Sequence, residues 1–148
     1  SFGIQKIIEL KKRDISKGFI LLASDIGYLL PYIDSQISED LLEQLSLPTK
    51  SPTTFLVPKS EELPPLLAGG NELLAVRITS NPLIKFFCEE TESALISTSA
   101  NLQGKKAAST QRELKSYFGN QLDYVLPPSG YNSEPSKIIN LMTGERLR

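Results

Sequence analysis

The sequence predicts an α/β or mixed α+β fold built on a single sheet. Short apolar runs of strand length alternate along the chain with segments of helical periodicity, which favours this class. The chain has 148 residues, of which 40% are hydrophobic and 22% charged, as is typical of a soluble globular protein. We therefore expect residues 1–148 to form one domain.

The first half of the chain alternates between helical and strand patterns. Helices are predicted for residues 2–12, for a short segment capped by Asp25 that reaches toward Tyr32, and for a segment opened by Ser38. Continuous apolar or β-rich runs predict strands at residues 18–23 and 53–57. Residues 59–65 are rich in proline and predict a loop or a broken helix, and Gly69-Gly70 predicts a turn.

The second half continues the alternation. Strands are predicted at residues 73–78, 94–98, 123–126 and 137–141, the last two separated by a Pro-, Gly- and Ser-rich loop at 127–136. Asn81-Pro82 predicts a helix that runs to about Glu90, because proline is favoured in the first helical turn. Another helix is capped by Ser109 or Thr110 and ends at Gly119.

Small polar side chains crowd into residues 97–101, read Ser-Thr-Ser-Ala-Asn, directly after an apolar run. An open α/β sheet often binds its ligand where a strand ends in such residues, since they let backbone amides approach phosphate oxygens. The same residue types also cap helices and build turns, so the run alone leaves both interpretations open.

A basic cluster precedes the strand predicted at residues 18–23. Lys11, Arg13 and Lys17 form a K-x-R-x-x-x-K pattern, with Lys12 beside them. Arginine grips phosphate or carboxylate bidentately and lysine acts as a point charge, so the cluster suits an anionic substrate. A solvated helix end, where cations favour the helix dipole, is the alternative.

The composition excludes several kinds of site. The chain has no histidine, which rules out a Ser-His-Asp triad, a Cys-His pair and a His-ligated metal within it. Its single cysteine, Cys88, precludes an intrachain disulfide and fits a buried apolar position. The net charge of −1 gives no overall attraction to nucleic acid, and no apolar run reaches membrane-spanning length.

Six blocks in order resemble the YrdC/TsaC family, the threonylcarbamoyl-adenylate synthases. They lie at residues 7–13, 17–23, 52–58, 74–82, 97–104 and 135–148. The strongest is Ser-Thr-Ser-Ala-Asn-Leu-Gln-Gly at 97–104. The resemblance implies a twisted open sheet with parallel and antiparallel strands, flanked by helices.

The resemblance also implies a reaction. The family condenses L-threonine, bicarbonate and ATP, with Mg²⁺, into threonylcarbamoyl-adenylate and pyrophosphate, a nucleotidyl transfer that serves threonylcarbamoyladenosine modification of tRNA. Such chemistry positions anions and neutralises charge, and it needs no covalent nucleophile. By resemblance the enzyme hands its product to tRNA-modification partner proteins, and the lack of a visible signal peptide or membrane-length apolar run favours a cytoplasmic location.

The resemblance assigns roles to individual residues. The catalytic tetrad corresponds to Lys11, Arg13, Ser99 and Asn101. Residues that would bind ATP are Arg13, Lys17, Thr98, Ser99, Asn101 and Arg148. Residues that would bind threonine or its carbamate are Arg77, Ser97 and Ser136, and no residue is expected to ligate a resident metal. ATP is expected to dock between the Lys11–Lys17 segment and the Ser97–Asn101 loop.

The chain departs from the family pattern in three places. It has no strand carrying Pro-Thr followed by an acidic residue before the first helix, so we expect the domain to be N-terminally incomplete and the 148 residues alone to be impaired. Residues 49–52 read Thr-Lys-Ser-Pro in place of W-P-G-P, and Asp14 stands where the family has proline. Two alternatives remain open: a non-catalytic module that binds double-stranded RNA, and a nucleotide-binding paralogue.

Overall fold

The computed structural model describes residues 2–127 and 135–148. Contacts divide the chain into two compact units. The first unit comprises Ser1–Ile15 with Thr98–Ser133, and the second comprises Ser16–Ser97 with Glu134–Arg148. The single domain expected from chain length stays a prediction.

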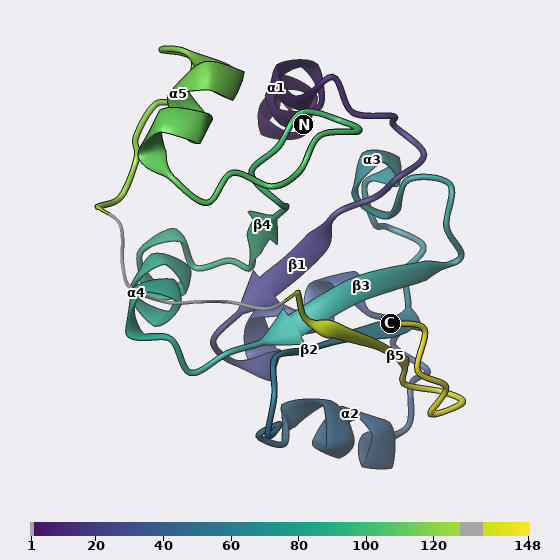
Figure 1. Ribbon diagram of the computed structural model, residues 1–148. Helices are drawn as coiled ribbons and strands as arrows, with labels where there is room; N and C mark the ends of the chain where they lie inside the picture. Colours follow the sequence, from purple (N-terminus) through teal and green to yellow (C-terminus); the bar gives the residue numbers. More distant parts are fainter. Residues whose placement is uncertain (1, 128–134) are drawn as a thin grey trace. The chain divides into compact units, whose positions relative to one another are not determined.

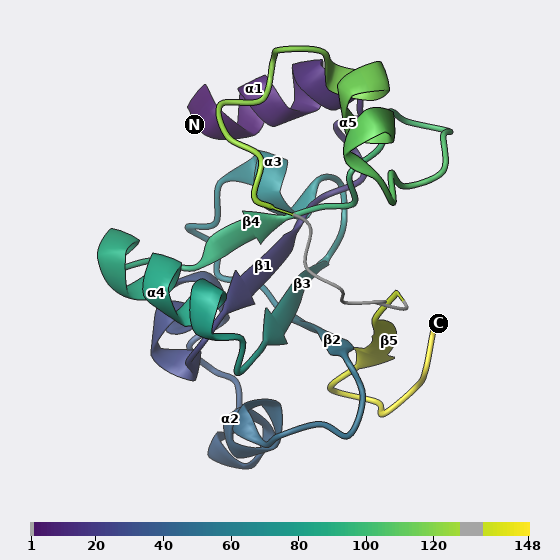
Figure 2. The same cartoon turned by 60° about the vertical axis from the view of Figure 1, so that its left-hand side comes forward.

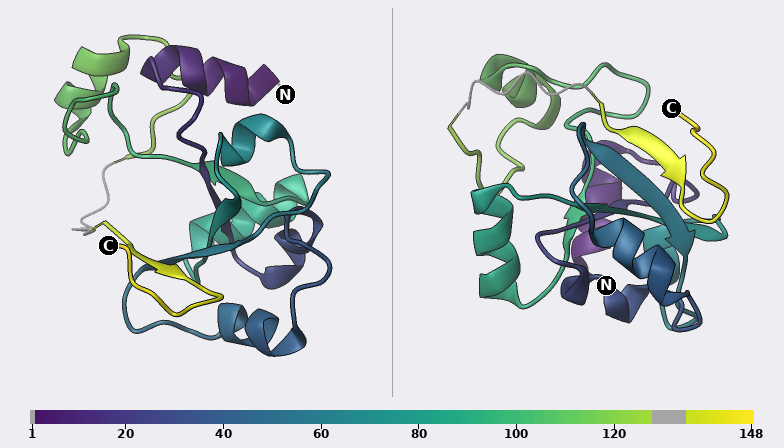
Figure 3. Two further views of the ribbon diagram at one scale, coloured as in Figure 1. Left: turned by 90° about the vertical axis from the view of Figure 1, so that its right-hand side faces the viewer. Right: turned by 90° about the horizontal axis from the view of Figure 1, so that it is seen from below.

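The second unit contains a five-stranded mixed sheet with the strand order β4-β1-β3-β2-β5. The strands are β1 (Ile20–Ala23), β2 (Thr53–Pro58), β3 (Leu73–Ile78), β4 (Leu95–Ser97) and β5 (Lys137–Asn140). Strand β1 pairs parallel with β3, and β2 pairs parallel with β5, whereas the β1–β4 and β2–β3 pairs are antiparallel. The mixed α/β class and the mixed sheet are thus confirmed (Figures 1 and 3).

The two faces of this sheet differ in burial. Leu21, Val76 and Phe55 are register partners across three strands, and they lie 2%, 0% and 7% exposed. Their neighbours along each strand point to the opposite face, because side chains alternate. On that face Ser97 pairs with Ile20, and most strand residues are half-buried. We call it the open face, and it is where polar side chains of the sheet can meet a ligand.

The described residues of the second unit form five helices, three of which begin at caps that the sequence indicates. They are the 3-10 helices η1 (Ile26–Tyr28) and η2 (Leu30–Tyr32), and the α-helices α2 (Glu39–Ser46), α3 (Pro65–Ala68) and α4 (Pro82–Thr91). The side chains of Asp25, Ser38 and Asn81 accept hydrogen bonds from backbone amides at these starts, as capping predicts. Helix α4 contacts β1 and α3 contacts β3 (Figure 2), and Cys88 on α4 is fully buried.

Two glycines permit a close approach of two loops beside β1. Gly18 has a φ of 26°, and a Cβ there would lie 2.6 Å from the carbonyl oxygen of Ala68. Gly69 has a φ of 62° and faces Ser16 and Gly18 in turn. The turn predicted at Gly69-Gly70 therefore packs backbone against backbone, which no larger side chain allows.

The described part of the first unit contains two helices, α1 (Phe2–Lys11) and α5 (Gln111–Phe118). Thr110 and Glu113 form a reciprocal capping box at the start of α5, which settles the choice between Ser109 and Thr110 as cap. An ion pair of 2.9 Å joins Lys6 on α1 to Asp123, in the segment that follows α5.

One predicted strand is wrong. Residues 123–126 are irregular, and Tyr124, Val125 and Leu126 are 77%, 41% and 46% exposed. Their β-branched and aromatic character indicates a strand only where a neighbouring strand and a buried face receive it. Among the described residues no strand pairs with this segment, and its side chains are exposed. The loop predicted at 127–136 lies largely outside the described residues. Within the described part of the chain, no helix has the length and apolarity needed to cross a membrane.

Candidate functional site

Lys11 ends helix α1 with its ammonium group turned into the loop that follows β4. The side chain is only 4% exposed. It donates hydrogen bonds to the main-chain carbonyl of Ser99, to that of Asn101 at 2.6 Å, and to the Asn101 side-chain oxygen at 3.2 Å. An ammonium has three donor hydrogens, so this loop supplies as many acceptors as Lys11 can use.

The loop is braced from within as well. Ser99 Oγ donates to Asn101 Oδ1 at 2.6 Å, and Asn101 Nδ2 donates to the Lys105 carbonyl at 2.7 Å. The Gln103 amide in turn donates to the Lys11 carbonyl at 3.0 Å. The structure therefore brings Lys11, Ser99 and Asn101 of the predicted tetrad into one hydrogen-bonded group, which we call the loop lock.

Burial changes the acid–base behaviour of the loop lock. Burial, and after it the positive charge of Arg13, lower the pKa of the Lys11 ammonium to about 8. Burial also lowers the pKa of Arg13. Two cations held in partly dehydrated surroundings favour an anionic partner, because it would offset their mutual repulsion.

The segment after α1 is held against the same loop. The backbone amide of Arg13 donates to the Ile8 carbonyl at 2.9 Å, and the Arg13 side chain is half-buried. The Asp14 amide donates to Gln103 Oε1 at 2.6 Å. The proline that the resemblance leads us to expect here would lack this N–H, so Asp14 makes a contact that proline could not make. Thr98, also half-buried, opens the loop.

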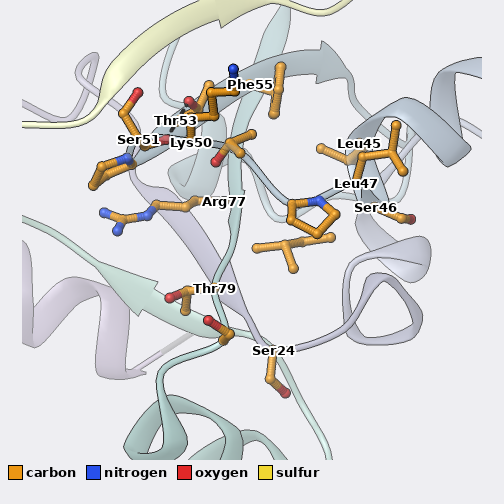
Figure 4. Close-up of a pocket in the computed structure, with 15 residues that line it drawn as sticks. Ser24, Leu45, Ser46, Leu47, Lys50, Ser51, Thr53, Phe55, Arg77 and Thr79 are labelled. Carbon is orange, nitrogen blue, oxygen red and sulfur yellow. Dashed lines mark hydrogen bonds between the residues drawn. The ribbon is translucent and has the colours of Figure 1, made fainter.

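In the second unit, Arg77 is the last but one residue of β3 and lines a cavity of about 420 Å³. Figure 4 shows its guanidinium extending away from Leu45 and Leu47, with Ser51 and Thr79 nearer to it. The cavity therefore combines two basic side chains, Arg77 and Lys50, and hydroxyl groups with an apolar wall. Such a lining suits a small molecule that carries a carboxylate and a short aliphatic part.

Ser97 is the last residue of β4, an edge strand of the sheet, where it pairs with Ile20 and is half-buried. The register that pairs Ile20 with Ala75 and Leu22 with Arg77 places Ser97 and Arg77 on the open face. Lys17, four residues beyond Arg13, belongs to the second unit and is exposed.

Ser136 precedes β5 and is 7% exposed. Its hydroxyl lies 2.7 Å from Thr54 Oγ1, and its carbonyl accepts from Arg148 Nε at 3.2 Å and Nη2 at 3.0 Å. The backbone of Arg148 is also held, because its carbonyl accepts from the Ile138 amide at 3.1 Å. Ser136 and Arg148, predicted for different substrates, are thus direct neighbours.

Several residues of the cavity and its surroundings escaped the sequence reasoning. Thr79 and Ser80 follow strand β3 just as Thr98 and Ser99 follow β4, so the same signal of small polar residues after a strand points to them. Thr54 gives no such signal, since a threonine inside a β-rich run is indistinguishable from an ordinary strand residue.

The family model described as telomere recombination, Sua5/YciO/YrdC, matches residues 2–148. The chain belongs to the Sua5/YciO/YrdC family. The resemblance inferred from the six sequence blocks is confirmed.

Curated members of the Sua5/YciO/YrdC family are similar over nearly the whole chain. The threonylcarbamoyl-AMP synthase of Nitrosococcus oceani is 42% identical over 151 residues, which cover 99% of this chain and 79% of that protein. The threonylcarbamoyl-AMP synthase of Pseudoalteromonas atlantica is 38% identical over 147 residues, covering 99% and 79%.

Solved structures of Sua5/YciO/YrdC proteins share the fold. P. abyssi Sua5, in a complex with L-threonine, superposes with a TM-score of 0.82 at 22% identity. This chain aligns over 99% of its own length and spans 43% of that Sua5. E. coli YciO gives a TM-score of 0.72 at 22% identity, over 95% of this chain and 68% of YciO.

Proposed function

We propose that this chain is a threonylcarbamoyl-AMP synthase, which joins L-threonine, bicarbonate and ATP into threonylcarbamoyl-adenylate and releases pyrophosphate. The observation that carries the proposal is the 42% identity to a synthase of that name across 99% of the chain. The intact Lys11–Ser99–Asn101 loop lock supports the synthase over an RNA-binding module or a paralogue of other chemistry.

Threonine and its carbamate are assigned to Arg77, Ser97 and Ser136. The threonine amine attacks bicarbonate, forming a C–N bond, and water leaves to give the carbamate. Arg77 would hold the threonine carboxylate, and the two serine hydroxyls would orient the carbamate by hydrogen bonds. The apolar wall of the cavity fits the threonine methyl group.

ATP is assigned to Arg13, Lys17, Thr98, Ser99, Asn101 and Arg148. A carbamate oxygen attacks the α-phosphorus, a P–O bond forms, and the bond to pyrophosphate breaks. The developing charge lies on phosphate oxygens, which the guanidinium of Arg13 and the ammonium of Lys17 would neutralise. Within the loop lock, Asn101 and Lys11 would keep Ser99 in place for the phosphates.

Mg²⁺ is proposed to enter as the magnesium salt of ATP. Within the part of the chain that the structure describes, no three acidic, histidine or cysteine side chains gather into a metal site. Magnesium is commonly held by substrate phosphates with few protein ligands, so this lining fits a substrate-borne ion. We assign the product to tRNA-modification partner proteins and the reaction to the cytoplasm.

The experiment that tests the proposed function measures pyrophosphate release by the purified full-length protein with ATP, threonine and bicarbonate. We expect release only when all three substrates are present, together with a product of the mass of threonylcarbamoyl-adenylate. Serine and alanine in place of threonine serve as controls for the cavity. Release that does not depend on threonine, or tight binding of double-stranded RNA without any turnover, would overturn the proposal.

A further inference from the structure

Thr54 is a polar side chain without solvent exposure in the middle of the sheet. It lies on β2 and is 0% exposed. The register pairs Leu56 with Ala75, so Thr54, two residues earlier, lies on the same open face as Arg77 and Ser97. A buried hydroxyl costs stability unless it has a partner, and its partner here is Ser136 Oγ at 2.7 Å.

The Thr54–Ser136 pair has a preferred direction once an anion binds. A hydroxyl donates one hydrogen bond and accepts up to two. If Thr54 donates to Ser136 Oγ, the Ser136 hydrogen is left for a carboxylate or carbamate oxygen. In the reverse direction the Ser136 hydroxyl would donate its hydrogen to Thr54 and could not donate it to the anion. A bound anion therefore favours Thr54 as donor, and a hydroxyl that accepts such a bond is itself a stronger donor.

Ser136 also contacts the other predicted substrate site. Its carbonyl accepts two hydrogen bonds from the Arg148 guanidinium, at 3.2 Å and 3.0 Å. The backbone of the adjacent residue is held too, because the Lys137 amide donates to the Pro52 carbonyl at 2.9 Å beside the Arg77 cavity. Ser136 therefore connects Arg148, which contacts its carbonyl, with the segment at Pro52 beside the Arg77 cavity, which holds the adjacent Lys137.

We propose that Thr54 is a positioning residue that orients and polarises the Ser136 hydroxyl for the threonine carbamate, while the carbonyl of Ser136 aims Arg148 at ATP. The proposal rests on the proposed synthase function and adds to it a residue that touches neither substrate. It makes Ser136 the junction at which threonine binding and ATP binding meet.

The test is a double-mutant cycle in the steady-state assay, with Thr54→Val, Ser136→Ala and the double variant. Valine keeps the branched shape of threonine and removes the hydroxyl. We expect Thr54→Val to raise the KM for threonine about tenfold, the effect of roughly one hydrogen bond. The double variant should have the same KM as Ser136→Ala alone, because Thr54 acts through Ser136. Thr54→Ser, which retains the hydroxyl, should restore most of the affinity.

Thr91→Val is the matched control. Its hydroxyl donates to the Phe87 carbonyl at 2.7 Å on helix α4, away from the residues assigned to substrates, so its removal should leave both KM values unchanged. Thermal unfolding of every variant checks that the protein is folded at the assay temperature. Thr54→Ala replaces Thr54→Val in the cycle if the valine variant unfolds there.

The outcomes separate the two proposals. Turnover by the unsubstituted protein, with KM effects of the two single variants that multiply in the double variant, overturns the positioning role and leaves the synthase intact. An unchanged KM for threonine in Thr54→Val also overturns the positioning role and leaves the synthase function intact. Absence of threonine-dependent turnover in the unsubstituted full-length protein overturns the proposed function, and the role of Thr54 with it.

Discussion

Lys11 donates to both oxygens of Asn101, to the main-chain carbonyl at 2.6 Å and to the side-chain amide oxygen at 3.2 Å. The two residues are 90 positions apart in the sequence, yet one ammonium group fixes the backbone and the side chain of the loop at once. The placement of Ser99, which donates to the same amide oxygen, follows from this contact.

Lys11→Met should loosen this loop. Methionine is of similar length but donates nothing, so the carbonyls of Ser99 and Asn101 lose their partner. We expect faster hydrogen–deuterium exchange at the amides of Asn101 and Ala108, which donate to Ser99 and Ala100 within the loop. ATP affinity should fall about tenfold or more. Lys12→Met, at the exposed neighbouring position, is the control. Equal rates of amide exchange in the two variants would argue against the loop lock.

The stability of the protein should depend on pH through Lys11. Its pKa is lowered to about 8 in the folded state, against 10.5 as its ordinary value, first by burial and then by Arg13. Between these values the unfolded chain binds more protons, so the free energy of unfolding contributed by Lys11 rises with pH. The increase between pH 7.5 and 10 should be about 2 kcal/mol.

The measurement compares urea unfolding of the unsubstituted protein and Lys11→Met at several pH values, because other titrating groups cancel in the difference. The carbon-13 resonance of the Lys11 Cε should titrate with a midpoint near pH 8. A difference in stability that stays flat from pH 7.5 to 10 would show that the ammonium is not dehydrated.

Arg13→Ala should abolish adenylate formation in an assay without RNA. Loss of a charge-assisted contact to phosphate in a dehydrated site costs on the order of 3 kcal/mol, or at least about a hundredfold in rate. Arg112→Ala, an exposed arginine on α5, serves as the control. Normal synthesis by Arg13→Ala with weakened, less salt-sensitive RNA binding would favour the RNA-binding module instead.

Arg77→Met should raise the KM for threonine by at least about tenfold, since the cavity loses the cation assigned to the carboxylate. ATP binding measured by calorimetry without threonine should stay the same, because the residues assigned to ATP are unchanged. Equal losses of affinity for threonine and ATP would indicate that Arg77 stabilises the sheet rather than binding threonine.

Gly18→Ala should destabilise the fold by about 2 kcal/mol, since it combines an unfavourable positive φ with a clash against the Ala68 carbonyl. Gly70→Ala is the control, because a Cβ there meets nothing within 4 Å. Chemical unfolding of both variants measures the effect, and similar midpoints would mean that the loops separate without cost.

The sequence by itself determined most elements and their starts, because these depend on neighbouring residues. Ser38, Asn81 and Thr110 bond to amides two or three residues away, and such caps can be read from residue order. Six family blocks in order likewise pointed to the correct family. The strand predicted at 123–126 failed because a strand needs a distant partner, which local composition does not supply.

Only the tertiary structure decided which side chains meet. Thr54 and Ser136 are 82 positions apart, and their hydroxyls come within 2.7 Å because β2 and β5 pair in parallel with Thr54 opposite Ile138. The lowered pKa of Lys11 likewise arises from burial against a loop 88 to 90 positions away. Register and dehydration are properties of packed elements, so no local pattern in the chain records them.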